Sequence, residues 1–207
     1  LMDKDFLLKK FNVSRETLSR IEHFKNLVLK ENSKINLISD KTKDIFIQRH
    51  IIDCVQIIDF IDKNSKTCTD LGSGAGLPGI ALAILLSDRN VDIKMNLYEK
   101  SYRKSNFLRL ASSELKLQTK IFQIDVFKEK KLSSGSILAR AFKPLPVVLE
   151  LVDKNFQKYS NLIIFMGKNG KQVLKNTFKH WYFEYKEEES ITSKGSFILN
   201  IKNIKKK

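Results

Sequence analysis

Glycines alternate with other residues in one stretch of the chain, Asp70-Leu71-Gly72-Ser73-Gly74-Ala75-Gly76-Leu77-Pro78-Gly79. Glycine lets the backbone turn sharply and lets a ligand approach with no Cβ in the way. The alanine- and leucine-rich segment that follows favours a helix, and the free N–H groups at a helix N-terminus attract anionic groups. The stretch predicts a cofactor-binding loop with the ligand at Gly74. The alternative is a tight strand-to-helix turn that binds nothing.

A carboxylate follows these glycines at an informative distance. Gly74, Gly76 and Gly79 satisfy the spacing G-x-G-x-x-G, and Glu99 comes about twenty residues later, where an acidic side chain accepts hydrogen bonds from ribose hydroxyls. Glu99 also ends a predicted strand, Val91 to Tyr98. Together they predict a cofactor that carries adenosine, although Glu99 as a solvated strand end is the competing interpretation.

Two further polar residues follow short apolar runs. Asp125 is placed to accept from an adenine amino group, with the main chain of Ile124 beside the ring; its alternative role is to cap the next segment. Arg140 follows Ser136-Ile137-Leu138-Ala139. Its guanidinium suits a phosphate or a guanine edge, so Arg140 is the expected catalytic residue, bordering both substrate and cofactor. A structural salt bridge is the other possibility for Arg140.

His50 and Asp53 lie three residues apart in a helical pattern, a spacing that places both side chains on one face. A catalytic pair is one interpretation. No nucleophile such as a G-x-S-x-G serine accompanies them, so a hydrogen-bonded structural histidine is favoured. No metal site is expected.

The elements that would position these residues alternate from residue 66 onward. Strands are expected at about 67–71, 93–98, 119–124, 136–139 and 161–166, with helices at about 78–86, 101–115, 145–156 and 170–178. This order predicts an α/β fold with a doubly wound, mostly parallel sheet. A last pair of strands, 181–186 and 197–201, predicts an antiparallel hairpin at one edge. Ligands bind beyond the carboxyl ends of such strands, so Gly72, Glu99, Asp125 and Arg140 should converge.

The first part of the chain is predicted to be a separate helical extension, residues 1–62, before a cofactor-binding domain at 63–207. Ser14 suits the N-cap of a helix whose Leu18, Ile21, Phe24 and Val28 recur at helical spacing. A second helix is expected from about Thr42 to Ile61.

The chain is strongly basic, with 38 Lys and Arg against 23 Asp and Glu among 207 residues, a formal net charge of +15. Such a surplus favours a polyanionic partner, nucleic acid first, because neutralised phosphates release counterions. Over-use of lysine by an AT-rich genome is the alternative. The two cysteines form no C-x-x-C pair, which points to a reducing cytosol, and no run approaches the ~18 apolar residues of a membrane span. A soluble cytoplasmic protein is expected.

Several motifs together resemble a known family, the bacterial 16S ribosomal RNA guanine-N7 methyltransferases, once called glucose-inhibited division protein B. They extend over nearly the whole chain: Asn36-Leu37, Arg49-His50-Ile51-Ile52-Asp53, the glycine stretch, Arg103-Lys104 with Phe107-Leu108, and Ala139-Arg140-Ala141-Phe142. The resemblance implies a class I S-adenosylmethionine-dependent methyltransferase fold, S-adenosyl-L-methionine as cofactor, 16S ribosomal RNA or the small ribosomal subunit as partner, and a monomer.

The resemblance also implies roles for single positions. Gly72 and Leu77 match the family's loop contacts to the cofactor, Ile124 and Asp125 its adenine-side pair, and Arg140 its arginine at the active crevice. One motif departs: the family usually has Lys-Gly just after the fifth strand, whereas Lys168 here follows Gly167. That shift of one residue puts the role of Lys168 in doubt.

The expected chemistry needs no acid–base machinery. Guanine N7 carries an exposed lone pair and no proton, so placement alone can suffice, and the absence of Asp-Pro-Pro-Tyr agrees with a ring-nitrogen acceptor. Two other classes stay open. A nicotinamide-dependent oxidoreductase would use the same glycines and Glu99, and an RNA-binding protein with a degenerate cofactor fold would explain the charge.

Overall fold

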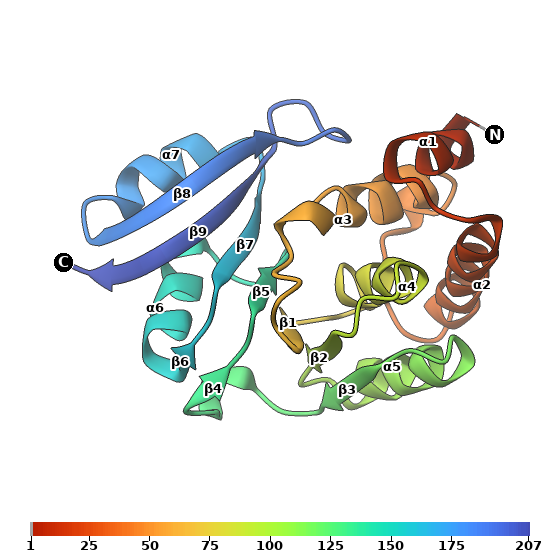
Figure 1. Cartoon of the computed structure of the whole chain (residues 1–207), viewed down its shortest axis with the longest axis horizontal. Helices are drawn as coiled ribbons and strands as arrows, with labels where there is room; N and C mark the ends of the chain where they lie inside the picture. Colours follow the sequence, from red (N-terminus) through yellow and green to blue (C-terminus); the bar gives the residue numbers. More distant parts are fainter. Residues whose placement is uncertain (1) are drawn as a thin grey trace.

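The computed structural model describes residues 2–207, in which helices and strands alternate over most of the chain (Figure 1). The longer helices are α1 (Met2–Phe11), α2 (Arg15–Asn32), α4 (Gly79–Asp88), α5 (Tyr102–Glu114), α6 (Leu145–Asn155) and α7 (Gly170–Thr177). The short ones are η1 (Asp40–Thr42), η2 (Ile47–Ile52), α3 (Asp53–Val55), η3 (Ile58–Phe60) and η4 (Val126–Lys128). The strands are β1 (Thr67–Leu71), β2 (Lys94–Tyr98), β3 (Thr119–Phe122), β4 (Leu132–Ser133), β5 (Ser136–Ala139), β6 (Phe156–Lys158), β7 (Asn161–Met166), β8 (Trp181–Glu189) and β9 (Phe197–Lys206).

Seven strands form one sheet in the order β3-β2-β1-β5-β7-β9-β8. The first five of these pair in parallel, and β9 and β8 are added antiparallel at one edge. The predicted α/β class, the doubly wound sheet and the edge hairpin are confirmed. The strand order reverses between β1 and β5, which makes their carboxyl ends the switch point of the sheet.

The register of the sheet brings the ends of the central strands level. Leu71 of β1 pairs with Tyr98 of β2 on one side and with Ala139 of β5 on the other. The residues that follow these strands therefore start at the same level along the sheet and lie opposite one another across the switch point. This alignment, set by backbone pairing, positions the site described below.

Side chains that alternate along the strands feed two hydrophobic cores, one on each face of the sheet. On β7, Ile163 belongs to the core beneath α2, α4 and α5, whereas Leu162 and Ile164 belong to the core beneath α6 and α7. Figure 1 shows these two groups of helices on opposite sides. Both faces are covered, as a parallel sheet requires.

Helix α4 explains why the N-terminal segment is needed. Its residues from Gly79 to Leu86 are all buried, and a helix that is apolar all round must be covered on every side. The sheet covers one side, and α2 and α3 pack against the helix from the other. The N-terminal segment thus shares a core with the domain at 63–207. The boundary at residue 62 stays a prediction.

The N-terminal segment confirms one local prediction and corrects another. Ser14 caps α2, because its Oγ accepts a hydrogen bond from Thr17 N at 3.0 Å. The single helix expected from Thr42 to Ile61 is wrong: the structure has η1, the π-helical η2, α3 and η3 in succession. The segment is rich in β-branched isoleucine, which restricts helix formation, and its buried side chains point in several directions.

Smaller features also differ from the sequence pattern. Strand β3 ends at Phe122 rather than at residue 124, and β4 and β6 form a two-stranded sheet that was not predicted. Strands of two or three residues are too short to show a periodicity. Within residues 2–207, every helix falls short of the length and apolar character needed to cross a membrane.

Candidate active site at the carboxyl ends of the strands

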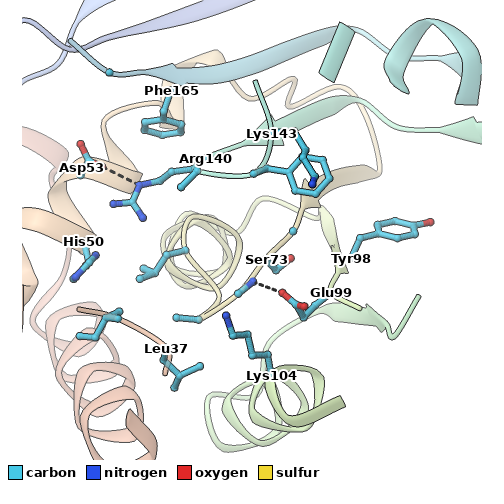
Figure 2. Close-up of a pocket in the computed structure, with 18 of the residues that line it drawn as sticks. Leu37, His50, Asp53, Ser73, Tyr98, Glu99, Lys104, Arg140, Lys143 and Phe165 are labelled. Atoms are coloured by element: carbon cyan, nitrogen blue, oxygen red, sulfur yellow. Dashed lines mark hydrogen bonds and ion pairs between the residues drawn. The ribbon is translucent and has the colours of Figure 1, made fainter. Parts of the chain in front are cut away.

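A cavity of about 830 Å³ opens at the switch point of the sheet. Its wall includes all seven residues expected at the site, namely Gly72, Gly74, Leu77, Glu99, Ile124, Asp125 and Arg140. The convergence predicted for the strand ends is therefore confirmed as geometry. The role of each residue stays a prediction. Figure 2 shows side chains from the N-terminal segment, from the loop after β1, from the end of β2 and from the segment after β5 around this space.

The glycines of the loop fall into two groups. Gly72, Gly74 and Gly76 have φ values of +70°, +53° and +81°, in the left-handed region that glycine adopts without strain. A Cβ on Gly74 would meet nothing closer than 3.8 Å, so its Cα faces open space. A Cβ on Gly76 would lie 2.4 Å from Ile80, and one on Gly79 would lie 2.4 Å from Leu97. The space beside Gly74 is open, whereas Gly76 lets the loop pack closely against Ile80 and Leu108, and Gly79 lets α4 pack closely against the sheet.

Glu99 fixes the position of the glycine loop. Its Oε2 accepts a hydrogen bond from Gly74 N at 3.0 Å, and its Oε1 accepts one from Ser101 N at 2.8 Å. The first of these is drawn in Figure 2. A carboxylate has about four acceptor positions, so each oxygen of Glu99 keeps a lone pair for a hydroxyl donor. Glu99 can therefore hold the loop and a ribose together.

Asp70 lies buried behind the loop, and no separate role was predicted for it. Its Oδ2 accepts a hydrogen bond from Gly79 N at 3.1 Å, at the start of α4, while Oδ1 has no partner in the described part of the chain. Burial raises the pKa of Asp70 to about 7; the nearby Ser73 hydroxyl, which donates to the Asp70 carbonyl at 3.2 Å, the hydrogen bond from Gly79 N and the charge of Arg140 act in the opposite direction. The carboxyl supports the loop from inside the protein.

Arg140 leaves β5 and points at the N-terminal segment. Its Nε donates to Asp53 Oδ2 at 2.9 Å (Figure 2), and its Nη2 donates to the carbonyl of Arg49 at 3.2 Å. The side chains of Arg140 and Asp53 are 17% and 11% exposed. The salt bridge weighed as an alternative is thus present. It leaves the Nη1 donors of Arg140 without a partner among residues 2–207, in the wall of the cavity.

His50 is neutral and structural in its contacts. Thr42 donates its hydroxyl proton to Ser39 O at 2.8 Å, so in the 2.9 Å contact between Thr42 Oγ1 and His50 Nε2 the ring nitrogen must be the donor. Burial, followed by the charges of Arg140 and Arg49, lowers the pKa of His50 to about 4. No hydrogen bond joins His50 to Asp53 within the described residues. The structural interpretation of this histidine agrees with these contacts.

The part of the cavity where the sequence predicts adenine has both polar and aromatic residues. Asp125 caps η4, where its Oδ1 accepts from Phe127 N at 3.2 Å, and Ile124 is half-buried beside it. The rings of Tyr98 and Phe122 stack at 4.5 Å nearby. The capping role considered for Asp125 is therefore present. A carboxylate oxygen that accepts one N–H retains further acceptor capacity toward a ligand.

The cavity is lined by four cations to which the sequence assigned no role at the site, although Arg49 and Lys104 lie in motifs of the family resemblance. Arg49, Lys100, Lys104 and Lys143 line it, and none of their side chains forms a salt bridge with the residues that the structure describes. Lys168 is exposed, and its neighbour Gly167 reaches the wall instead. The sequence signal for Lys104 was the Arg103-Lys104 motif, and the signal for Lys100 was its position next to Glu99. Lys143 had no sequence signal other than its position three residues after Arg140.

Comparison with known proteins places the chain in a family. A model for rRNA small subunit methyltransferase G matches residues 17–201. The Ribosomal RNA small subunit methyltransferase G of Pelagibacter ubique is 52% identical over 203 residues, which make up 97% of this chain and 95% of that protein. The protein of that name in a Ruegeria species is 34% identical over 94% of this chain and 95% of its own length.

Solved structures agree on the fold. The 16S rRNA methylase RmtB superposes with a TM-score of 0.53 at 12% identity, covering 94% of this chain and 76% of that chain. A SAM dependent methyltransferase from Aquifex aeolicus superposes with a TM-score of 0.57 at 14% identity, covering 82% and 96%. Both show the class I methyltransferase architecture expected from the sequence. By its sequence and its fold, the chain belongs to the rRNA small subunit methyltransferase G family.

Proposed function

We propose that this protein transfers a methyl group from S-adenosyl-L-methionine to N7 of a guanine in the 16S ribosomal RNA of the small subunit. The observation that carries the proposal is the family membership over residues 17–201. The cavity at the switch point supplies a site in keeping with it. We propose further that the protein acts as a cytoplasmic monomer.

The described residues fit the cofactor. Open space lies beside the backbone of Gly74, where a side chain would otherwise stand, and Glu99 retains acceptors for ribose hydroxyls. Ile124 and Asp125 suit the adenine ring of the cofactor, and Gly72 and Leu77 suit the rest of the cofactor. The volume of about 830 Å³ lies near the top of the roughly 300–1,000 Å³ range of ligand pockets. It leaves room for a base beside the cofactor.

The acceptor side is polar and cationic. The free Nη1 donors of Arg140 suit a guanine edge or a phosphate. Lys104 and Lys143, one on each side of the glycine loop, suit the phosphates of neighbouring nucleotides (Figure 2). A target base in folded RNA must leave its stack to enter such a cavity. Cations at the entrance compensate part of that cost.

The chemistry asks for placement. S-adenosyl-L-methionine supplies a methyl carbon on a sulfonium, which a nitrogen lone pair can attack. Guanine N7 has such a lone pair and loses no proton, so no general base is required. The neutral, hydrogen-bonded His50 agrees with this requirement. The residues of the chain act by orienting two reactants, an effect that can contribute roughly 7–11 kcal/mol.

The proposal is tested by mapping 7-methylguanine in 16S ribosomal RNA. Small subunits from cells that lack this modification are incubated with the purified protein and S-adenosyl-L-methionine, and modified guanines are located by strand cleavage after borohydride reduction. One new site that requires both protein and cofactor is expected. Methylation at another atom, or in another RNA, would contradict the proposal. Calorimetry with NAD should show no binding, which separates it from an oxidoreductase.

A further inference from the structure

The carboxylate of Asp53 joins three parts of the chain at the edge of the cavity. Oδ2 accepts from Arg140 Nε at 2.9 Å, whereas Oδ1 accepts from Thr192 Oγ1 at 2.5 Å and from Gln56 Nε2 at 3.2 Å. Asp53 is 8% exposed. A buried carboxylate is costly unless donors surround it, and here each oxygen has at least one.

These contacts fix the plane of the Arg140 guanidinium. Nε is held by Asp53 and Nη2 by the carbonyl of Arg49 at 3.2 Å. A guanidinium is planar, so two fixed nitrogens determine where the third points. Arg140 lines the cavity, and its Nη1 donors have no partner among residues 2–207, so they remain available to a ligand. The direction of Arg140 is thus set by the N-terminal segment and not by β5 alone.

The same carboxylate holds the loop between β8 and β9. Besides the Thr192 contact, Ile191 N donates to Gln56 Oε1 at 3.0 Å, and Gln56 in turn donates to Asp53. Ser190, Ser193 and Ser196 of this loop line the cavity. Figure 1 shows the loop reaching from the edge of the sheet toward α1 and α3.

We propose that Asp53 is a positioning residue for methyl transfer: it aims Arg140 into the cavity and fastens the 190–196 loop beside it. This inference rests on the proposed function. A buried ion pair contributes little to stability compared with well-packed apolar residues, so stability gives a poor reason for this arrangement. The geometry gives a better reason, because one side chain holds two separate walls of the cavity in place.

Asp53→Asn is the informative variant, because it keeps the shape of the side chain and removes the charge that orients Arg140. We expect kcat on small subunits to fall about tenfold to a hundredfold, the cost of misplacing a reacting group by about 1 Å. The Kd of S-adenosyl-L-methionine should change little. Asp59→Asn is the matched control. Asp59 lies in the same segment, and its side chain is 82% exposed and pairs with Lys63 and Arg89. The kcat of the Asp59→Asn variant should equal that of the wild type.

A double-mutant cycle separates positioning from a general structural effect. In an Arg140→Gln background, Asp53→Asn should cause little further loss of kcat, because the group it orients is gone. Independent, multiplicative losses would overturn the inference, as would wild-type kcat in Arg140→Gln or in Asp53→Asn.

Thr192→Val tests the loop even if Asp53→Asn fails to fold. It leaves the ion pair in place, and it should raise amide hydrogen exchange at Ile191 and lower kcat. Wild-type behaviour in both measurements would also overturn the inference. If the wild-type protein itself methylates no 16S ribosomal RNA, the proposed function is wrong. If the wild-type protein is active and the variants behave as the wild type does, only the role of Asp53 is wrong.

Discussion

Single glycines in the cofactor loop have different physical tasks, and this difference is testable. Gly74→Val places a branched side chain in the open space of the cavity at a φ of +53°, so S-adenosyl-L-methionine binding should be lost while the protein stays folded. Gly76→Val instead drives a side chain into Ile80 at 2.4 Å and should destabilise the fold. Calorimetry and thermal unfolding measure the two effects. Full cofactor affinity in a folded Gly74→Val protein would remove this loop from the site.

Asp70 predicts a pH dependence of stability. Burial raises its pKa from 3.8 to about 7, so between these values the folded state holds a proton that the unfolded state has released. The contribution of Asp70 to stability is therefore fully present below pH 4 and is lost as pH rises toward 7, by at most about 1.4 kcal/mol per pH unit. Urea unfolding at several pH values measures this dependence, and in Asp70→Asn the fall in the free energy of unfolding between pH 4 and 7 should be absent. Parallel stability curves for the two proteins between pH 4 and 7 would contradict the shift.

Elements with a strong pattern could be predicted from the sequence, and elements governed by tertiary contacts could not. The bounds of β5 and β7 match the expected ranges because short apolar runs between polar residues define them locally, and β1 matches because the glycine loop ends it. The segment from Thr42 to Ile61 also has a helical pattern, yet it is not one helix: η2 and α3 are continuous, whereas η1 ends at Thr42 and η3 is a separate short turn. Its buried side chains and the bonds of Arg49 and Asp53 to distant groups decide its shape. No local sequence signal carries those bonds.

A hydrogen bond within this segment, between Thr42 of η1 and His50 of η2, permits a prediction. Thr42→Val removes the acceptor of His50 Nε2 and leaves a buried donor unpaired, which should lower the free energy of unfolding by about 1–3 kcal/mol. Thr42→Ser keeps the hydroxyl and is the control. Urea denaturation measures both. Equal losses in the two variants would show that the methyl group, and not the hydrogen bond, stabilises this segment.

At the scale of the whole molecule, the cavity is assembled from both ends of the chain. The sequence predicted the residues that follow β1, β2 and β5, because parallel strands bring their carboxyl ends together. It did not predict the wall formed by the N-terminal segment and the 190–196 loop, since the contact between Asp53 and Thr192 joins residues 139 positions apart. The sequence also gives a net charge of +15 but does not predict where the cations lie, and the structure places several of them at the cavity.

The charge leads to a prediction about RNA binding. If lysines and arginines neutralise phosphates, affinity for 16S ribosomal RNA should fall linearly on a log–log plot against salt, with a slope of about −0.7 to −0.9 per phosphate contact. Lys104→Gln and Lys143→Gln, at the cavity, should each reduce the magnitude of the slope by about 1. Lys66→Gln should leave it unchanged, because Lys66 lies at the opposite end of β1 and pairs with Asp92 at 2.8 Å. If RNA affinity does not change with salt concentration, the excess of lysine and arginine is a compositional bias. If all three variants change the slope equally, the phosphate contacts are not concentrated at the cavity.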